Sequence, residues 1–369
     1  MKRVYIITWL GNGNFGTSLQ AFALYKKLSD CGYDVYHLMN FDVSFSWKSY
    51  IKYILTLNGH LKLRQWYDAL KSTKQRKLYI FNKKNYKIKK VYTPKQYQRL
   101  LKSTDVFLTG SDQIWNTYHN YSPFLFLDFA RKVKRAAYAS SIGTSDIPEQ
   151  YRNIIKDHLS KFKHIGVREK SAVNVLSKLL QRQDIVQVVD PTFLLSSNEW
   201  IEISNHATIE FKLPEKYILC YLIGNNTTYK QQLTDIRNKT GIYNIIIIPA
   251  CENPNFNLED SFVYSQAGPE EFVKLIEKSS IVCTDSFHAT AISINLSKNF
   301  IEFMRFSETD KVSQNSRIHD LLEHYALTSR IYSQRNEEWL KDIDYDRVQI
   351  VLNQDRKESM KYLIKAIEQ

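Results

Sequence analysis

Residues 281–290, with the sequence IVCTDSFHAT, combine side chains that could bind and protonate a small anion. The apolar run ending in Thr284 predicts a buried strand, and the residues after it predict a helix. Asp285 and Ser286 are both common helix N-caps, so Phe287 and His288 fall in the first helical turn. Backbone N–H groups there lack intrahelical partners and attract anions, and an imidazole titrates near neutral pH. A capped helix with a surface histidine is the plainer interpretation.

A second stretch with ligand-binding character is GNGNFG at residues 11–16, between an expected strand and an expected helix. Its spacing fits the dinucleotide-binding pattern G-x-G-x-x-G, for which Asp42 could supply the acid. Asn12 and Asn14, however, place amides where a pyrophosphate loop usually has small residues. The glycines, Gly16 included, could also serve only a tight turn. We expect Asn12, Asn14 and Gly16 to bind substrate.

Polar residues follow another expected strand, at the edge where α/β sheets place their ligands. Asp112 and Gln113 could bind vicinal hydroxyls, with Ser111 beside them, and Trp115 could stack on a sugar face. Asp112 could equally cap a helix, which is the commoner role for such an aspartate.

Several cations could hold a phosphate or carboxylate. Arg168 closes an expected strand, and a guanidinium there could bind such a group in a bidentate manner. Pairing with an acid such as Glu169 is an equally open alternative. Arg305, Lys311 and Arg317 follow His288 within thirty residues and could reach the same anion.

The elements that must position these residues alternate between strand and helix. A chain of 369 residues with 43% apolar content predicts two folded domains. We expect an α/β protein with two doubly wound, Rossmann-like domains. The expected domains are residues 1–197, with a helical insertion at 43–102, and residues 214–332, followed by a helical tail at 333–369 that packs back on the first domain. The expected strands are 4–10, 34–39, 105–109, 135–140, 164–167, 186–189, 217–223, 243–249, 281–284 and 300–304.

Cysteine usage and hydropathy indicate the cellular compartment in which we expect the protein. The four cysteines lie far apart and form no CxxC pair, which favours a reducing compartment and argues against a zinc site or disulfides. No run of 18 or more apolar residues exists, so we expect no membrane span. The N-terminal run lacks a small-residue cleavage site and predicts a strand, not a signal peptide. We expect a cytoplasmic protein without a metal.

The net charge of +13 is concentrated in one segment. Between Lys48 and Lys102 there are sixteen basic residues and one acid, Asp68, so the remainder of the chain sums to −2. Aromatic and aliphatic residues are interleaved with these cations, a combination that suits a helix on an anionic membrane surface. Nucleic acid is the rival partner, and a solvated helical face is about as plausible as either. We favour the membrane and expect no nucleic-acid partner.

Six motifs together resemble the polysaccharide pyruvyl transferase family. In chain order they are GNGNFGTSLQAFAL, LTGSDQIWN, GVREKSA, VVDPTFLL, GPEEFVKLIEKSSIVCTDSFHAT and NSRIHDLL, and they span residues 4 to about 325. One departure is Ala289, where many members have glycine after the histidine. The segment 43–102 and the tail past Tyr332 carry no recognisable motif.

The resemblance implies a fold similar to the glycosyltransferase B type, with the active site between the domains. It implies phosphoenolpyruvate as donor substrate, no further cofactor, and a sugar of a cell-surface glycan precursor as acceptor, pyruvylated as a ketal. The arginine and histidine of the family's motifs correspond to Arg168 and His288, and a further cation to Arg305 or Lys311. On this basis we expect His288 to act as the acid, Asp112 as base or orienter, and Arg168 to neutralise the donor. A lipid-linked acceptor would place the enzyme on the inner face of the membrane.

Two different functions stay open at this point. A nucleotide-sugar glycosyltransferase of similar fold would use the 281–290 turn for a diphosphate. A non-catalytic module that binds anions or glycans would release no phosphate from phosphoenolpyruvate. An NAD dehydrogenase is the weakest alternative, because it leaves the turn at His288 unused.

Overall fold

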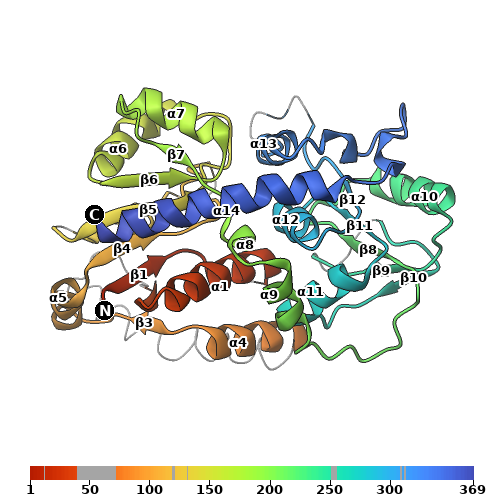
Figure 1. Cartoon of the computed structure of the whole chain (residues 1–369), viewed down its shortest axis with the longest axis horizontal. Coiled ribbons are helices and arrows are strands. Elements are labelled where there is room, and N and C mark those ends of the chain that lie inside the picture. Colours follow the sequence, from red (N-terminus) through yellow and green to blue (C-terminus); the bar gives the residue numbers. More distant parts are fainter. Residues whose placement is uncertain are drawn as a thin grey trace. The chain divides into compact units, whose positions relative to one another are not determined.

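The structure is a computed structural model that describes residues 1–11, 13–39, 72–118, 121–130, 132–250, 256–307, 310 and 313–369. The chain forms two compact units, each with helices flanking a parallel sheet (Figure 1). The first unit contains Met1–Asn12, Thr17–Leu194 and Asp355–Gln369, and the second contains Gly13–Gly16 and Leu195–Gln354. The expected fold class is confirmed.

The first unit is built on a seven-stranded sheet in the order β3-β2-β1-β4-β5-β6-β7. All neighbouring strands pair in parallel. The strand order reverses between β1 and β4, which is the topological switch point where such sheets bind ligands. The strands are β1 (Arg3–Ile7), β2 (Asp34–Met39), β3 (Ile88–Lys90), β4 (Val106–Thr109), β5 (Lys134–Ser140), β6 (His164–Val167) and β7 (Val186–Gln187).

Helices connect these strands and cover the sheet. The start of α5 shows how the local sequence fixes a helix end. Thr93 and Gln96 form a capping box around Pro94 in the first turn. The helices of this unit are α1 (Phe15–Asp30, whose first two residues belong to the second unit), α4 (Thr73–Asn85), α5 (Pro94–Ser103), η1 (Asp128–Ala130), α6 (Glu149–Ser160), α7 (Lys170–Leu180), α8 (Pro191–Leu194) and the last part of α14 (Tyr345–Glu368).

The second unit repeats the design on a smaller scale. Its five parallel strands follow the order β10-β9-β8-β11-β12, with the switch point between β8 and β11. The strands are β8 (Ile218–Tyr221), β9 (Ile245–Ile247), β10 (Ser261–Val263), β11 (Ile281–Thr284) and β12 (Phe300–Glu302). The helices are α9 (Ser197–Ser204), α10 (Tyr229–Thr240), α11 (Pro269–Lys278), α12 (Phe287–Asn295), α13 (Ser316–His324), η2 (Thr328–Arg330), η3 (Glu338–Leu340) and the first part of α14.

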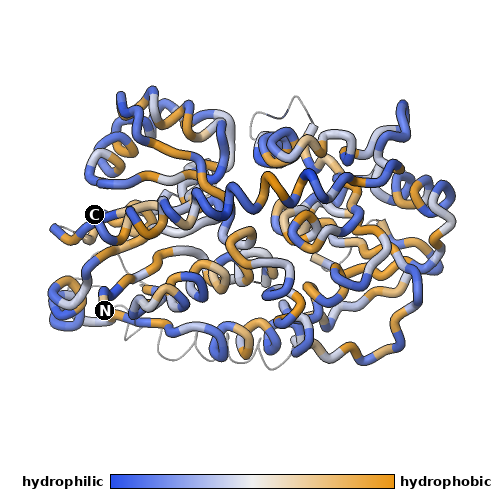
Figure 2. Tube along the Cα trace, in the orientation of Figure 1, coloured by the Kyte–Doolittle hydropathy of each residue, from blue (hydrophilic) through white to orange (hydrophobic). Residues whose placement is uncertain are grey.

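The central strands β1 and β4 are mostly hydrophobic along their length (Figure 2), and nearly all of their residues are buried. Successive residues of a strand point to opposite faces, so Tyr5 and Ile7 join one core cluster and Val4 and Ile6 join the other. Burial of both faces is what an all-parallel sheet requires. Leu363 and its neighbours at the end of α14 belong to the second of these clusters.

Most expected strands occur within two residues of their predicted bounds, although the structure shortens several of them. The edge strands β3 and β10 were not expected, because each has three residues and a mostly exposed pattern. Residues 43–71 of the expected insertion lie outside the described residues, and the rest forms α4, β3 and α5. Among the described helices, none has the length and apolar character that crossing a bilayer requires.

Candidate functional site

The first candidate site lies at the switch point of the seven-stranded sheet. After β4 the chain passes through Gly110 and Ser111 to Asp112, whose φ of 71° is in the left-handed region. Asp112 forms an isolated parallel bridge with Ser140 at the end of β5. The residues that follow, 113–118, form turns, so Asp112 does not cap a helix.

The carboxylate of Asp112 is held from two sides. The Thr17 hydroxyl in α1 donates to Oδ2 at 2.8 Å, and the Gln113 backbone N–H donates to Oδ1 at 2.9 Å. The side chain is buried, with Asp112 only 6% exposed. A carboxylate fixed in this way is oriented before any substrate arrives, which is the geometry of a base or an orienting acceptor.

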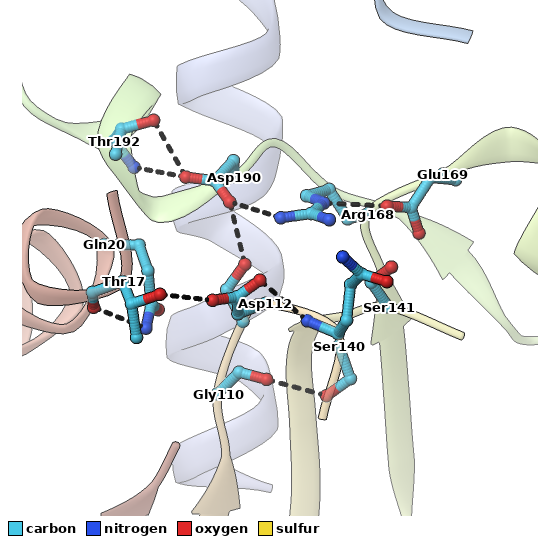
Figure 3. A network of polar contacts seen from close by, with 12 residues as sticks. Thr17, Gln20, Gly110, Asp112, Ser140, Ser141, Arg168, Glu169, Asp190 and Thr192 are labelled. Carbon is cyan, nitrogen blue, oxygen red and sulfur yellow. Dashed lines mark hydrogen bonds and ion pairs between the residues drawn. The ribbon is translucent and has the colours of Figure 1, made fainter. Parts of the chain in front are cut away.

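Arg168 lies in the same polar network (Figure 3). Its Nε donates to Glu169 Oε1 at 2.8 Å, and its Nη1 donates to Asp190 Oδ2 at 3.1 Å. Asp190 Oδ2 also accepts from the Ser111 hydroxyl at 2.8 Å, and Asp190 Oδ1 accepts from the N–H and hydroxyl of Thr192. The ends of β4, β6 and β7 are therefore tied together by charged hydrogen bonds.

The electrostatics of this network favour the internal pairing of Arg168. Burial lowers the pKa of the guanidinium, but the charges of Glu169, Asp190 and Asp112 outweigh burial and raise its pKa. Arg168 is 4% exposed. In this structure Arg168 therefore pairs with neighbouring acids, which was one of the two expected alternatives. Its binding to the donor stays a prediction.

Gln113 and Trp115, which were also expected to bind at this turn, have different surroundings. The Gln113 side-chain oxygen accepts from Asn116 Nδ2 at 2.8 Å beside Asp112. Trp115 is 1% exposed and stacks on Phe126 at 5.7 Å between ring centroids. The indole therefore packs in the core, where a sugar could not stack on it as expected.

The second candidate site lies at the switch point of the five-stranded sheet. Asp285 follows β11, and its carboxylate accepts from the N–H groups of Ile223 and Gly224 at 2.6 and 2.7 Å and from the Tyr229 hydroxyl at 3.0 Å. A Cβ on Gly224 would come within 2.9 Å of Asp285 Oδ2, so a glycine at this position lets the carboxylate come close to the backbone. Asp285 thus joins the ends of β8 and β11 and does not cap α12.

Ser286 is the N-cap residue of α12, without a side-chain capping bond, and its N–H donates to Thr284 Oγ1 at 3.1 Å. Phe287 and His288 are the first two residues of the helix, and their rings meet edge to face at 5.5 Å. All nine residues of α12 are buried. The first turn of a buried helix has the local polarity that favours an anion.

His288 packs against the glycine stretch. A Cβ placed on Gly16 would come within 2.4 Å of the imidazole Nδ1, and His288 is 6% exposed. The Gly16 N–H donates to Asn14 Oδ1 at 2.9 Å. Gly16 therefore allows α1 to begin against the imidazole, and Asn14 accepts a hydrogen bond from the first turn of that helix.

Arg305 is the expected cation that the structure places at this turn. Its Nε donates to Asp285 Oδ2 at 3.2 Å and its Nη2 donates to the Asp285 carbonyl at 2.8 Å. The side chain is 21% exposed, whereas that of Asp285 is fully buried. Arg317 instead donates to Gln314, to both its carbonyl and its side-chain oxygen. Lys311 and Asn12 lie outside the described residues.

Sequence reasoning did not identify Glu302. It ends β12 in register with Thr284, is fully buried, and its Oε2 accepts from the Thr290 hydroxyl at 2.5 Å. Burial raises its pKa well above the ordinary value. A polar residue at the end of a buried strand was the available signal. Asp190 and Thr192 lie within the motif VVDPTFLL, but their roles depend on contacts that the motif does not specify.

The described chain also holds a cavity away from these sites. It has a volume of about 420 Å³ and opens at the opposite edge of the five-stranded sheet, near Lys216, Ser280 and Asn299. Among the described residues, no group of three or more His, Cys, Asp or Glu side chains could hold a metal ion.

Within the first unit, the structure thus brings Ser111, Asp112, Gln113 and Arg168 into one region. Within the second unit, it brings Gly16, His288 and Arg305 to the turn at Asp285. Each group occupies the edge where parallel sheets bind ligands.

The fold is that of glycosyltransferase B-type proteins. A UDP-GlcNAc 2-epimerase from Neisseria meningitidis is 11% identical, with a TM-score of 0.51 over 99% of this chain and 94% of that chain. A UDP-N-acetylglucosamine 2-epimerase from Rickettsia bellii is 9% identical, with a TM-score of 0.50 over 100% and 97%. Such identities establish the fold alone. No curated protein sequence matches the chain.

A family model described as polysaccharide pyruvyl transferase matches residues 14–304. The match covers most of the chain and includes both switch-point turns, the one after β4 and the one after β11. The chain therefore belongs to the polysaccharide pyruvyl transferase family.

Proposed function

We propose that the protein transfers the pyruvyl group of phosphoenolpyruvate to two hydroxyls of a sugar in a polysaccharide precursor, forming a ketal and releasing phosphate. The observation that supports this most strongly is the turn at the end of β11. There a histidine occupies the first turn of a buried helix, and Asp285 orients an arginine that is one-fifth exposed. Family membership supplies the reaction class.

The donor carries a phosphate and a carboxylate, so its site needs cations and N–H donors. The N-terminal N–H groups of α12 supply oriented dipoles, and Arg305 supplies a guanidinium with planar donors. The bonds from Arg305 to Asp285 fix that guanidinium without a large rearrangement on binding. We assign the donor to this turn, and no cofactor takes part in the proposal.

The chemistry requires one proton donor and a base for each of two hydroxyls. His288, when protonated, gives a proton to C3 of the enol, while a sugar hydroxyl oxygen bonds to C2 and loses its proton to a base. The C2–O bond to phosphate then breaks, a second hydroxyl oxygen bonds to C2, and the departing phosphate takes up the proton of that hydroxyl. Phosphate departs with the bonding electrons, and Arg305 stabilises its charge. The products are the ketal and inorganic phosphate.

We assign the acceptor to the network of the first unit. Its acids, Asp112, Glu169 and Asp190, outnumber its one arginine, which suits the recognition of hydroxyl groups more than of a second anion. Asp112 is the base or orienter for a hydroxyl. In this proposal Arg168 positions the acids around it, a role that replaces the donor binding expected from the family resemblance. A lipid-linked oligosaccharide on the cytoplasmic side of the membrane is the proposed form of the acceptor.

The test is a product assay with the full chain and a panel of lipid-linked and free oligosaccharides. With phosphoenolpyruvate, we expect acceptor-dependent phosphate release and a ketal carbon in the ¹³C spectrum of the product. A sugar nucleotide should neither raise the melting temperature nor act as donor. Transfer from a sugar nucleotide would favour a glycosyltransferase, and glycan binding without phosphate release would favour a non-catalytic module.

A further inference from the structure

The helix α4 has two unlike faces. Leu78 and Phe81 are buried and anchor the helix to the first unit, and the Ser72 side chain caps its N-terminus. Asn82 Nδ2 adds a hydrogen bond to the Leu10 carbonyl at 2.7 Å. The inner face is therefore fixed to the unit by packing and by polar contacts.

The outer face of α4 combines cations with large apolar side chains. Tyr79 is 60% exposed and Ile80 is 53% exposed, one turn from Arg76 and Lys83, which are also exposed. Residues three and four apart lie on the same side of a helix, so these four form one surface. We call them the α4 outer face. In Figure 2 the helix is hydrophilic with hydrophobic interruptions.

The charge around this face is of one sign. Residues 72–104 contain eleven lysines and arginines and no acid, whereas the other parts of the chain carry 40 basic and 38 acidic residues. The elements α4, β3 and α5 succeed one another along one edge of the first unit (Figure 1). Beyond α4, the exposed cations of this stretch include Lys89, Lys95, Arg99 and Lys102.

We infer that the α4 outer face docks on an anionic lipid surface, with Tyr79 and Ile80 entering the headgroup region and Arg76 and Lys83 facing acidic lipid. Cations near such a surface each strengthen binding, and apolar side chains add to it by leaving water. The rigid inner face means that no ordering of the helix is needed on binding.

A lipid surface accounts for the α4 outer face better than solvent or nucleic acid does. Lysines on β3 are expected at a sheet edge, where charge discourages pairing with another chain. The choice among lipid, solvent and nucleic acid therefore depends on α4. A solvated face accommodates the cations and a nucleic-acid surface uses them, but neither gains much from an exposed isoleucine. A lipid surface uses Tyr79 and Ile80 together with the charge.

The experiment is sedimentation of the full chain with vesicles of phosphatidylcholine, with or without phosphatidylglycerol. We expect binding only to the acidic vesicles, and binding that weakens as salt is added. Tyr79→Ser with Ile80→Ser should weaken it at least about ten-fold. The matched control is Ile350→Ser on α14, where Ile350 is 72% exposed, and it should bind as the unmodified protein does.

Charge is tested in the same way. Arg76→Gln and Lys83→Gln should each weaken binding about five-fold. The control pair, Lys357→Gln with Lys361→Gln on exposed positions of α14, should have no effect. Unchanged melting temperatures will show that the variants are folded.

Three results would overturn the inference. They are no binding to acidic vesicles, equal binding by the Tyr79→Ser/Ile80→Ser variant, and binding to single-stranded DNA as tight as to vesicles and independent of Tyr79 and Ile80. The inference goes beyond the proposed transfer reaction and does not rest on it, because vesicle binding needs neither donor nor acceptor.

Discussion

Gly16 and His288 approach each other so closely that a single added carbon on the glycine would lie 2.4 Å from the imidazole Nδ1. The two residues are 272 positions apart in the sequence. One lies in the first turn of the first helix of the chain, and the other lies in the first turn of a helix late in it. The beginning of α1 therefore restricts the position of the proposed acid.

Gly16→Ala should displace the imidazole and lower turnover by at least about 100-fold, since a small misplacement of a catalytic group has effects of that size. Helix propensity alone would stabilise the alanine variant by about 1 kcal/mol. The contact with His288 opposes that gain, so we expect no increase in the unfolding free energy. Phosphate release and urea unfolding measure the two effects.

A double-mutant cycle shows whether the effect acts through the imidazole. In a His288→Gly background the imidazole and the Cβ of His288, which the added carbon would meet at 2.4 and 2.5 Å, are both absent, so Gly16→Ala should change turnover little further. Additive losses in the double variant would mean that Gly16 acts by another route.

The network around Asp190 should contribute strongly to stability. Asp190→Asn removes the charge that faces Arg168 in a fully buried pair, and we expect a loss of about 3–5 kcal/mol in the free energy of unfolding. The matched control is Asp184→Asn, which breaks an ion pair with Arg182 in which Asp184 is 62% exposed. That change should cost less than about 1 kcal/mol. Equal losses in both variants would contradict the role given to the network.

Glu302 should make the protein less stable as the pH rises. Burial raises its pKa well above the ordinary 4.5, and the charge of Asp285 raises it further. The hydrogen bond from Thr290 and the charges of Arg305 and Arg317 lower the pKa, but by less. A raised pKa in the folded state means that folding takes up a proton. The stabilisation is complete below the unfolded pKa and is lost as pH rises through the folded one.

The Glu302→Gln variant stays neutral and should therefore gain in melting temperature, relative to the unmodified protein, as pH increases. Thermal unfolding across a pH series measures this difference, with the exposed Glu323→Gln as control. A difference that stays constant with pH would show that Glu302 is ionised in the folded state.

Arg305 should act mainly on the donor. Arg305→Lys keeps a cation but loses the planar donors, so we expect the KM for phosphoenolpyruvate to rise at least about ten-fold with a smaller change in kcat. Arg305→Met also leaves the buried Asp285 charge without its cation and should lower the melting temperature as well. An unchanged KM in the lysine variant would remove Arg305 from the donor site.

The sequence predicts the fold well because the strands are short, buried and clearly separated by turns. The runs at Ile281–Thr284 and His164–Val167 occur with the predicted bounds. The three-residue strands β3 and β10 escape prediction, since their exposed residues lack the apolar pattern of a core strand.

The sequence identifies many residues of the candidate sites, but it does not show which partners their side chains contact. Asp285 is the expected type of N-cap, but tertiary contacts with Gly224 and Tyr229 decide its orientation. For Trp115, stacking on Phe126 in the core could not be read from a local motif. The pairing of Arg168 with Asp190 likewise depends on which strands are neighbours, and no spacing in the sequence states that.

His288 is the proposed acid for a donor bound at the start of α12, and its removal is the most direct test of the proposed reaction. The measurement is acceptor-dependent phosphate release from phosphoenolpyruvate by His288→Gln, beside the exposed control His206→Gln. We predict that His288→Gln loses at least about 100-fold in kcat, as expected for a general acid, while His206→Gln retains full activity. Turnover by His288→Gln at the unmodified rate would contradict the proposed role.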